Sequence, residues 1–583
     1  MTAAPLTAAA LLAAALATVV IGLYGNRLSR TTSDFLVASR SIGPQWNAAA
    51  ISGEYLSAAS FLGVAGLIAK YGADALWYPV GFTAGYLGLL LFVAAPLRRS
   101  GAYTVPDFAE FRLGSVRLRK VAMLVVVVVC TFYLVPQYQG AGLALKTLLG
   151  LPVWVGPVTV GVIVIVNVVG GGMRSITFVQ AFQYWLKLTA IAVPALVLLA
   201  LVLRDGSDLG GPLPPRVGQE TTVAVETDVV VGVAAPAGIV VTGTVDGRSV
   251  ADAPLAAPGE YALAAGTTLR LAAGAVTPVV AGAPGAGEDW LASGGGLGGD
   301  HPTYQVLSII IATFLGTMGL PHVLVRFYTN PDGRAARRTA LAVIALLSLF
   351  YLFPTLLGVF ARQFVPQLLI TGTADAAVLL APSAAVGGAS AVAWLAPALA
   401  ALVAAGAIAA FLATSSGLLI SIAGALSTDV LGGRVRDFRV AALVGGIVPV
   451  PLALLASSLE LSRSVGLAFA VAASTLCPLL VLGVWWRGLT AAGAAAGLVV
   501  GGVASGVATT LSIAGGLDDD LLGGWPAAIV GYPAAVTVPL AFVVMVVVSR
   551  CTAATHPADV ARSFARMHLP EHLGMGADRL PGD

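Results

Sequence analysis

The sequence predicts an all-α polytopic membrane protein with about thirteen transmembrane helices and one small β-rich insertion. Of its 583 residues, 58% are hydrophobic and only 10% are charged, whereas soluble domains carry about 25% charged residues. Apolar segments of about 20 residues, the length of helix that crosses a bilayer, recur along most of the chain. The net charge of +3 is too small to indicate a nucleic-acid partner. These observations exclude a water-soluble fold.

Thirteen segments reach the length of a span. The first has no basic residue ahead of its apolar run, unlike a cleaved signal peptide, so we expect it to remain as a helix. The expected spans lie near 5–25, 45–68, 74–96, 121–147, 152–172, 178–203, 304–327, 340–361, 393–425, 440–458, 464–485, 488–513 and 526–549.

Basic residues divide unevenly between the loops that these spans define. With the N-terminus outside, 22 of the 31 lysines and arginines, Arg326 among them, fall on the inner side, 8 fall outside, and Lys187 lies within a span. Cytoplasmic loops are enriched in Lys and Arg, so we expect the N-terminus outside and the C-terminus in the cytoplasm. The Ala- and Gly-rich composition and the excess of Arg over Lys favour the plasma (inner) membrane of a bacterium.

Residues 205–300 interrupt the spans with short β-branched runs separated by Asp-Gly, Ala-Pro-Gly and Ala-Gly turns, a pattern typical of strands and hairpins. The expected topology places this insertion outside the cell. A purely structural role is favoured, because no titratable cluster marks a site, but capping the entrance or binding a partner stays open. The expected organisation is spans one to six over 1–204, the insertion over 205–300, spans seven to thirteen over 301–550 and a cytoplasmic tail over 551–583.

Two spans carry more polar residues than lipid tolerates. The second span contains Glu54 among small and hydroxylated residues, and a break there would expose backbone carbonyls to a cation and a helix N-terminus to an anion. The ninth span contains Thr414, Ser415 and Ser416 before Gly417, and hydroxyls are hard oxygen ligands of the kind that an alkali cation requires. Tight packing of small residues is the alternative explanation of both segments.

Two further polar residues lie inside predicted spans. Lys187 either pairs with Glu54, contacts an anionic substrate or extends to an interface, and the last is favoured because the sequence identifies no partner. His322 follows Pro321, which is expected to break the seventh span; it is either structural or handles a proton or a carboxylate.

No catalytic constellation is evident. The three cysteines have no metal-like spacing, and the five histidines are scattered, so the sequence predicts neither a zinc site nor a disulfide framework. A membrane enzyme would need a nucleophile and base or a metal centre. We therefore expect a protein that is not an enzyme and has no cofactor other than a coupling ion.

Three motifs resemble those of the sodium:solute symporter family, and within it the cation/acetate and monocarboxylate symporters. The most specific is the Gly-Leu-Pro-His…Arg-Phe element within Gly316–Thr329, and Gly171–Ser175 and Thr104–Phe108 support it. Asn167 departs from the residue usual beside the second motif. The resemblance covers all thirteen spans and excludes the insertion and the tail.

The resemblance implies a leucine-transporter-type core of two inverted five-helix repeats, formed by spans two to six and seven to eleven. It also implies a cation site, with Na⁺ favoured and H⁺ open. Ala413 stands where the family has a Ser, so one hydroxyl ligand is missing and Ser415 or Ser416 is expected to compensate. The implied cation-binding residues are Ala48, Ile51, Ala410, Ala413, Thr414 and Ser415.

The function that the resemblance implies is import of a small monocarboxylate, such as acetate, propionate or pyruvate, with a cation by alternating access. Symport of another small solute such as proline, or sensing of a ligand by a transporter-like receptor, are the alternatives. Oligomeric state is not predicted. The residues expected to line the substrate site are Tyr55, Ser57, Ala58, Phe61, Gln137, Gln139, Thr317 and His322.

Overall fold

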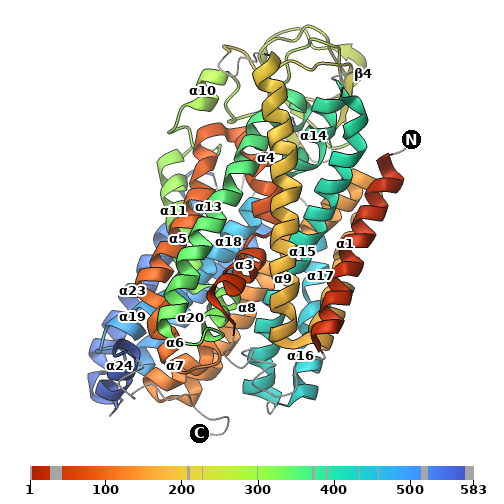
Figure 1. Ribbon diagram of the computed structural model, residues 1–583. Coiled ribbons are helices and arrows are strands. Elements are labelled where there is room, and N and C mark those ends of the chain that lie inside the picture. The colour runs from red at the N-terminus through yellow and green to blue at the C-terminus, as the bar shows by residue number, and fades with distance from the viewer. Residues whose placement is uncertain are drawn as a thin grey trace.

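The structure, a computed structural model, is a bundle of long helices with a small β-sheet at one end (Figure 1). It describes residues 3–26, 42–205, 211–225, 228–298, 300–370, 374–388, 392–431, 434–456, 459–513, 523–557 and 559–570. Within these ranges, 11 helical segments are long and apolar enough to cross a membrane. The chain is therefore a multi-pass membrane protein.

The segments differ from the thirteen predicted spans in two places. The second predicted span, 45–68, is divided between the helix Pro44–Tyr55 and the start of one apolar stretch, Ala59–Arg99, which also contains the third predicted span and turns at Gly72, where φ is 65°. The fifth predicted span corresponds to a shorter apolar helix, Val155–Gly170.

The helical elements before the sheet are α1 (Ala3–Asn26), α3 (Pro44–Tyr55), η2 (Ala59–Gly63), α4 (Val64–Tyr71), η3 (Gly72–Leu76), α5 (Trp77–Gly88), η4 (Leu89–Val93), α6 (Ala94–Arg99), α7 (Val105–Leu113), α8 (Val116–Leu149) and α9 (Val155–Asp205). Those after it are α10 (Gly287–Leu291), α11 (Pro302–Gly319), α12 (Pro321–Tyr328), α13 (Gly333–Phe364), η5 (Pro366–Leu369), η6 (Ala374–Ala376), α14 (Ala377–Gly387), η7 (Ala393–Leu395), α15 (Ala396–Leu426), η8 (Ser427–Leu431), α16 (Val435–Ile447), α17 (Pro449–Leu455), α18 (Leu461–Ser474), α19 (Leu476–Trp485), α20 (Ala491–Ile513), α22 (Trp525–Gly531), α23 (Ala534–Cys551), η9 (Ala553–Thr555) and α24 (Val560–His568).

Helix α9 packs against different partners along its length. In its first part, Gly156 lies against Ala141 and Gly161 lies beside Tyr138, so this part runs antiparallel to α8. In its second part, Ser175 donates a hydrogen bond to the Gly22 carbonyl (2.6 Å), and Gln183 bonds Thr18 (3.0 Å), so this part runs antiparallel to α1. The second part also contacts α3 and α15, which brings it to the centre of the bundle.

Local sequence explains where several helices begin and break. Thr104 caps α7 by accepting a hydrogen bond from the Asp107 amide (3.2 Å), which gives the Thr104–Phe108 motif a structural reason. Pro321 occupies the first turn of α12, directly after α11 ends at Gly319. Proline has no N–H to continue the preceding helix but fits the start of a new one, so the Gly-Leu-Pro element breaks this span as predicted.

The sheet lies within the stretch for which the sequence predicts strands. Its seven antiparallel strands run in the order β1-β6-β3-β5-β2-β7, with β4 paired to β3. The turn between β3 and β4 holds Asp246 and Gly247 at φ 49° and 74°, the conformation that Asp-Gly favours in a two-residue hairpin turn. The strands are β1 (Thr221–Ala224), β2 (Val229–Val233), β3 (Ile239–Val245), β4 (Arg248–Pro254), β5 (Gly259–Leu263), β6 (Thr268–Leu271) and β7 (Val279–Val280).

Polar contacts fasten the segment after the sheet to the bundle. Trp290 donates to the Ile68 carbonyl (2.8 Å), and the Arg362 guanidinium bonds the carbonyls of Ala69 (3.1 Å) and Gly285 (2.7 Å). At the opposite end of the bundle, α24 lies beside α6 and α7 (Figure 1). The sheet and the C-terminal helix therefore mark the two ends of the bundle.

Candidate functional site

The second predicted span breaks at Leu56, where α3 ends and before η2 begins. A helix end leaves its last carbonyls without intrahelical donors. Here side chains from two other helices supply donors: the Lys187 amine of α9 donates to the Gly53 and Leu56 carbonyls, the latter at 2.7 Å, and the Thr414 hydroxyl of α15 donates to the Glu54 carbonyl at 2.6 Å. The break is thus closed by one basic group and one hydroxyl.

A buried ion pair lies next to this break. Arg326 Nε is 2.6 Å from Glu54 Oε2, and both side chains are almost completely inaccessible to solvent. The remaining guanidinium donors bond Thr177 (2.7 Å) and Gln180, and Gln180 in turn donates to the Ala413 carbonyl (2.9 Å). A buried ion pair requires such additional hydrogen bonds to offset its desolvation. Since these bonds link side chains and carbonyls of α3, α9, α12 and α15, they fix the four helices relative to one another.

Two predictions from the sequence are wrong here. Lys187 does not extend to an interface; it is fully buried and holds two carbonyls of the α3 break. Arg326 does not lie in an inner loop, because it is buried within α12 and paired with Glu54. The signal that the sequence analysis missed was the free-energy cost of burying the Glu54 carboxylate, because a carboxylate inside a membrane span needs a cationic partner.

The residues expected to bind a cation lie on two helices that contact each other, α3 and α15. Thr414 reaches the Glu54 carbonyl rather than those of the two expected α3 residues, and the Ala413 carbonyl accepts from Gln180. The hydroxyls of Ser415 and Ser416 are buried without a hydrogen-bond partner among the described residues. All six expected residues are buried: Ala48, Ile51, Ala410, Ala413, Thr414 and Ser415.

Several of the expected substrate-lining residues come together. The Tyr55 hydroxyl is 2.7 Å from Thr317 Oγ1 and donates to the Phe82 carbonyl at 3.0 Å. The Gln137 side chain accepts from the Ala58 amide at 2.8 Å, just after the break. Tyr55 also packs edge-on against Tyr86, with ring centroids 4.9 Å apart. This part of the core combines aromatic faces with hydroxyl groups beside the break.

The other expected lining residues are more dispersed. Gln139 bonds the Leu459 carbonyl and Ser464, and Phe61 faces Phe350 at 6.5 Å between ring centroids. Ser57 is buried at the break. The His322 ring lies 5.3 Å from that of Tyr133, and neither ring nitrogen has a hydrogen-bond partner in the described part of the chain.

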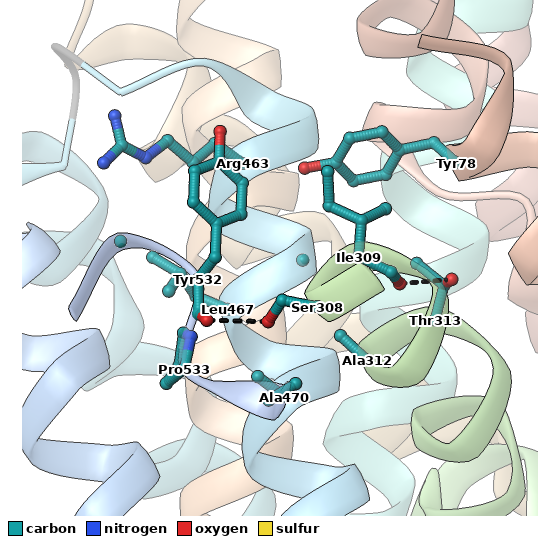
Figure 2. Close-up of a pocket in the computed structure, with 13 residues that line it drawn as sticks. Tyr78, Ser308, Ile309, Ala312, Thr313, Arg463, Leu467, Ala470, Tyr532 and Pro533 are labelled. Atoms are coloured by element: carbon teal, nitrogen blue, oxygen red, sulfur yellow. Dashed lines mark hydrogen bonds between the residues drawn. The ribbon is translucent and has the colours of Figure 1, made fainter. Parts of the chain in front are cut away.

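A small cavity is lined by Ser308 and Thr313 of α11 (Figure 2), and Thr313 lies one turn before Thr317. The cavity volume is about 20 Å³, enough for roughly one water molecule. Ser308 donates to the Tyr532 carbonyl at its wall (2.6 Å), and Thr313, also in the wall, accepts a hydrogen bond from Thr317 through its carbonyl (2.8 Å). The Arg463 guanidinium, the charged group in the described lining, points away from Ser308 in Figure 2.

Comparisons with known proteins identify the family of this chain. The family model "Sodium:solute symporter family" matches residues 35–206 and 288–501. The chain is 31% identical over 543 residues to the uncharacterized symporter YwcA of Bacillus subtilis, covering 90% of each protein. It is 30% identical over 546 residues to the monocarboxylic acid transporter of Corynebacterium glutamicum, covering 90% of this chain and 88% of that one.

A solved Na⁺-coupled sialic acid symporter shares the fold, with a TM-score of 0.61 at 13% identity, covering 94% of this chain and 97% of that one. This likeness confirms the leucine-transporter-type fold that the motifs implied. The family match on both sides of the sheet establishes that the chain belongs to the sodium:solute symporter family.

Proposed function

We propose that this protein imports a small monocarboxylate, of the size of acetate, propionate or pyruvate, together with a monovalent cation. The observation that carries the proposal is the charge at the α3 break. Glu54 and Arg326 neutralise each other at 2.6 Å, whereas the described hydrogen bonds of the Lys187 amine are to carbonyls, so protonation of Lys187 gives the buried centre one excess positive charge. A monocarboxylate would balance that charge.

The surroundings favour a small substrate. Phe82 and Phe469 approach with ring centroids 4.9 Å apart, and Tyr55 lies against both. A large solute would have to displace several of these buried rings, whereas a two- or three-carbon acid would displace few. The relative named as a monocarboxylic acid transporter supports the same substrate class.

The proposed mechanism is alternating access. Substrate and cation bind beside the α3 break, and the helices that carry Glu54 and Thr414 then move relative to the rest of the bundle to open the opposite side. We place the sheet outside and α24 in the cytoplasm of a bacterium, because they lie at opposite ends of the bundle (Figure 1) and basic residues favour the α24 side.

The test is uptake of radiolabelled acetate, propionate and pyruvate into proteoliposomes under imposed Na⁺, H⁺ or electrical gradients. Protein-free vesicles are the blank, because the uncharged forms of these acids cross lipid unaided. We expect protein-dependent accumulation of at least one acid under one cation gradient, and competition by the others. Absence of accumulation and of counterflow under every gradient would refute monocarboxylate symport. Labelled proline serves as the matched solute for the alternative function.

A further inference from the structure

The contacts of Lys187 point to the identity of the coupling ion. We propose that the Lys187 amine is a tethered cation at the α3 break, and that its protonation and deprotonation couple transport to H⁺. This inference rests on the proposed function, since it specifies which cation accompanies the substrate.

The first step of the argument is the position of the amine. The carbonyls of Gly53 and Leu56 are two of those freed where α3 ends, and carbonyls freed by a broken membrane helix are the groups that coordinate an alkali cation in transporters. Lys187 Nζ donates to both. The Lys187 nitrogen, which carries one positive charge when protonated, therefore binds carbonyl oxygens that a sodium ion would coordinate.

The second step is the number of hydrogen bonds. An ammonium has three N–H donors, and the described contacts of Lys187 account for two acceptors. A neutral amine retains two N–H bonds, so loss of the proton sacrifices neither contact. Lysine can lose its proton in a buried position, which arginine does not do.

The third step is the surrounding charge. Helices α14, α15 and α17 contact α9 and contain no titratable residue, and α1 contains only Tyr24. The charged residues of α8, α13 and α16 lie in their terminal turns. The helices packed here bury these titratable groups: Glu54 and Tyr55 at the end of α3 and, away from the helix ends, Cys130, Tyr133 and Tyr138 of α8, Tyr184 of α9 and Tyr351 of α13.

Among those groups only Glu54 is ordinarily charged near neutral pH, and it is paired with Arg326. The charge of the centre therefore depends on Lys187. An uncompensated charge is costly at this depth, so two states are favourable: protonated Lys187 with a bound carboxylate, and neutral Lys187 with no substrate. If only these two states reorient across the membrane, each monocarboxylate moves with one proton, and the cycle is electroneutral.

The sequence supplies an independent reason for H⁺ in place of Na⁺. Position 413 of α15 is an alanine, which offers no hydroxyl ligand to a sodium ion, and its carbonyl accepts a hydrogen bond from Gln180.

The decisive experiment measures pyruvate transport in proteoliposomes in two ways, as accumulation under a pH gradient and as exchange of labelled for unlabelled pyruvate. It compares wild type with Lys187→Met, Lys187→Arg and, as the matched control, Lys146→Met on α8. In Na⁺-free medium, a gradient of one pH unit should drive wild type and Lys146→Met toward an accumulation of up to about tenfold. Both Lys187 variants should lose this accumulation. Lys187→Arg, whose fixed charge still balances a carboxylate, should keep part of the exchange of labelled for unlabelled pyruvate, whereas Lys187→Met, which lacks that charge, should lose exchange too. Accumulation by Lys187→Met under the pH gradient, or a requirement of wild type for Na⁺, would overturn the proposal.

A second measurement does not depend on the substrate. Lys187→Met leaves the Gly53 and Leu56 carbonyls open, so NaCl should raise the Tm of the purified variant by a few degrees relative to choline chloride, while wild type should not respond. Equal responses of the two proteins would refute the tethered cation. If wild type carries no monocarboxylate in either mode, the proposed function fails, and this comparison still decides the role of Lys187.

Discussion

The two broken helices of the core are closed by different means. The break after α3 is closed by side chains from distant helices: Lys187 and Thr414 donate to its carbonyls, and Gln137 accepts from the amide that follows it. The break between α11 and α12 is closed by packing. A Cβ on Gly319 would lie 2.5 Å from the Ala472 carbonyl oxygen, so the backbones of α11 and α18 are in direct contact there.

This difference indicates separate tasks for the two breaks. The first holds charge and hydroxyl groups that can exchange partners with an ion or a substrate. The second offers a rigid contact and one histidine, His322, whose ring nitrogens have no partner among the described residues. The Glu54–Arg326 pair joins them, because Glu54 immediately precedes the last residue of α3 and Arg326 lies in α12.

Removal of that link should have the largest effect. Arg326→Met leaves the Glu54 carboxylate buried and unpaired, which costs about 3–5 kcal/mol. We expect a large fall in Tm in detergent, with partial recovery when Glu54→Gln is added. Arg270→Met is the control, because Arg270 and its partner Asp252 are both exposed and such pairs contribute about 0–1 kcal/mol. A wild-type Tm for Arg326→Met would show that the pair does not fasten the two breaks.

The next effect should come from Gly417 of α15. A Cβ at this position would lie 1.8 Å from Glu54 Oε1, whereas a Cβ on Gly424 of the same helix meets nothing within 4 Å. Gly417→Ala should destabilise the protein by about 1–3 kcal/mol, and Gly424→Ala should stabilise it by about 0.5–1 kcal/mol through helix propensity. Thermal unfolding of the two variants measures the difference. Similar shifts for both would mean that Glu54 is not confined by α15.

Much of the fold follows from local sequence, but the closure of the α3 break does not. Hydropathy indicates the spans, Asp246–Gly247 indicates a hairpin, and Pro321 indicates a helix break, because each acts through its own neighbours in the chain. Arg326 and Lys187 lie 272 and 133 residues from Glu54, so their contacts depend on how the helices pack. Both residues also resemble ordinary features of membrane proteins, an arginine near a helix end and a lysine that reaches an interface.

The candidate site was predicted unevenly for the same reason. The Tyr55–Thr317 and Ala58–Gln137 contacts join residues that the family resemblance had grouped. The partner of Thr414 differs from expectation, because α3 continues as a helix to Tyr55 and presents the Glu54 carbonyl to α15. A shift of one helical turn along α3 therefore changes which carbonyl a hydroxyl meets, and no motif reports such a shift.

A smaller effect is expected from Thr414→Ala. The substitution removes the donor to the Glu54 carbonyl, which should cost about 1–2 kcal/mol. We expect the half-saturation concentration for the coupling cation to rise more than the KM for pyruvate. Ser421→Ala is the control, because among the described residues Ser421 bonds the Gly417 carbonyl of its own helix (3.1 Å). An unchanged cation dependence would exclude Thr414 from the coupling site.

The smallest effect on stability should come from His322→Gln, which tests the second break. The substitution removes no hydrogen bond that the structure describes, and it nearly conserves volume, so the free energy of unfolding should change by less than about 1.5 kcal/mol. If His322 donates to the carboxylate of the substrate, its loss should raise the KM for pyruvate by about tenfold or more, because a hydrogen bond to a charged group contributes about 1.5–3 kcal/mol. His556→Gln, on an exposed residue near the C-terminal end, controls for loss of an imidazole. A wild-type KM and pH profile for His322→Gln would leave the α11–α12 break with a purely packing role, and substrate recognition would then lie entirely with the α3 break.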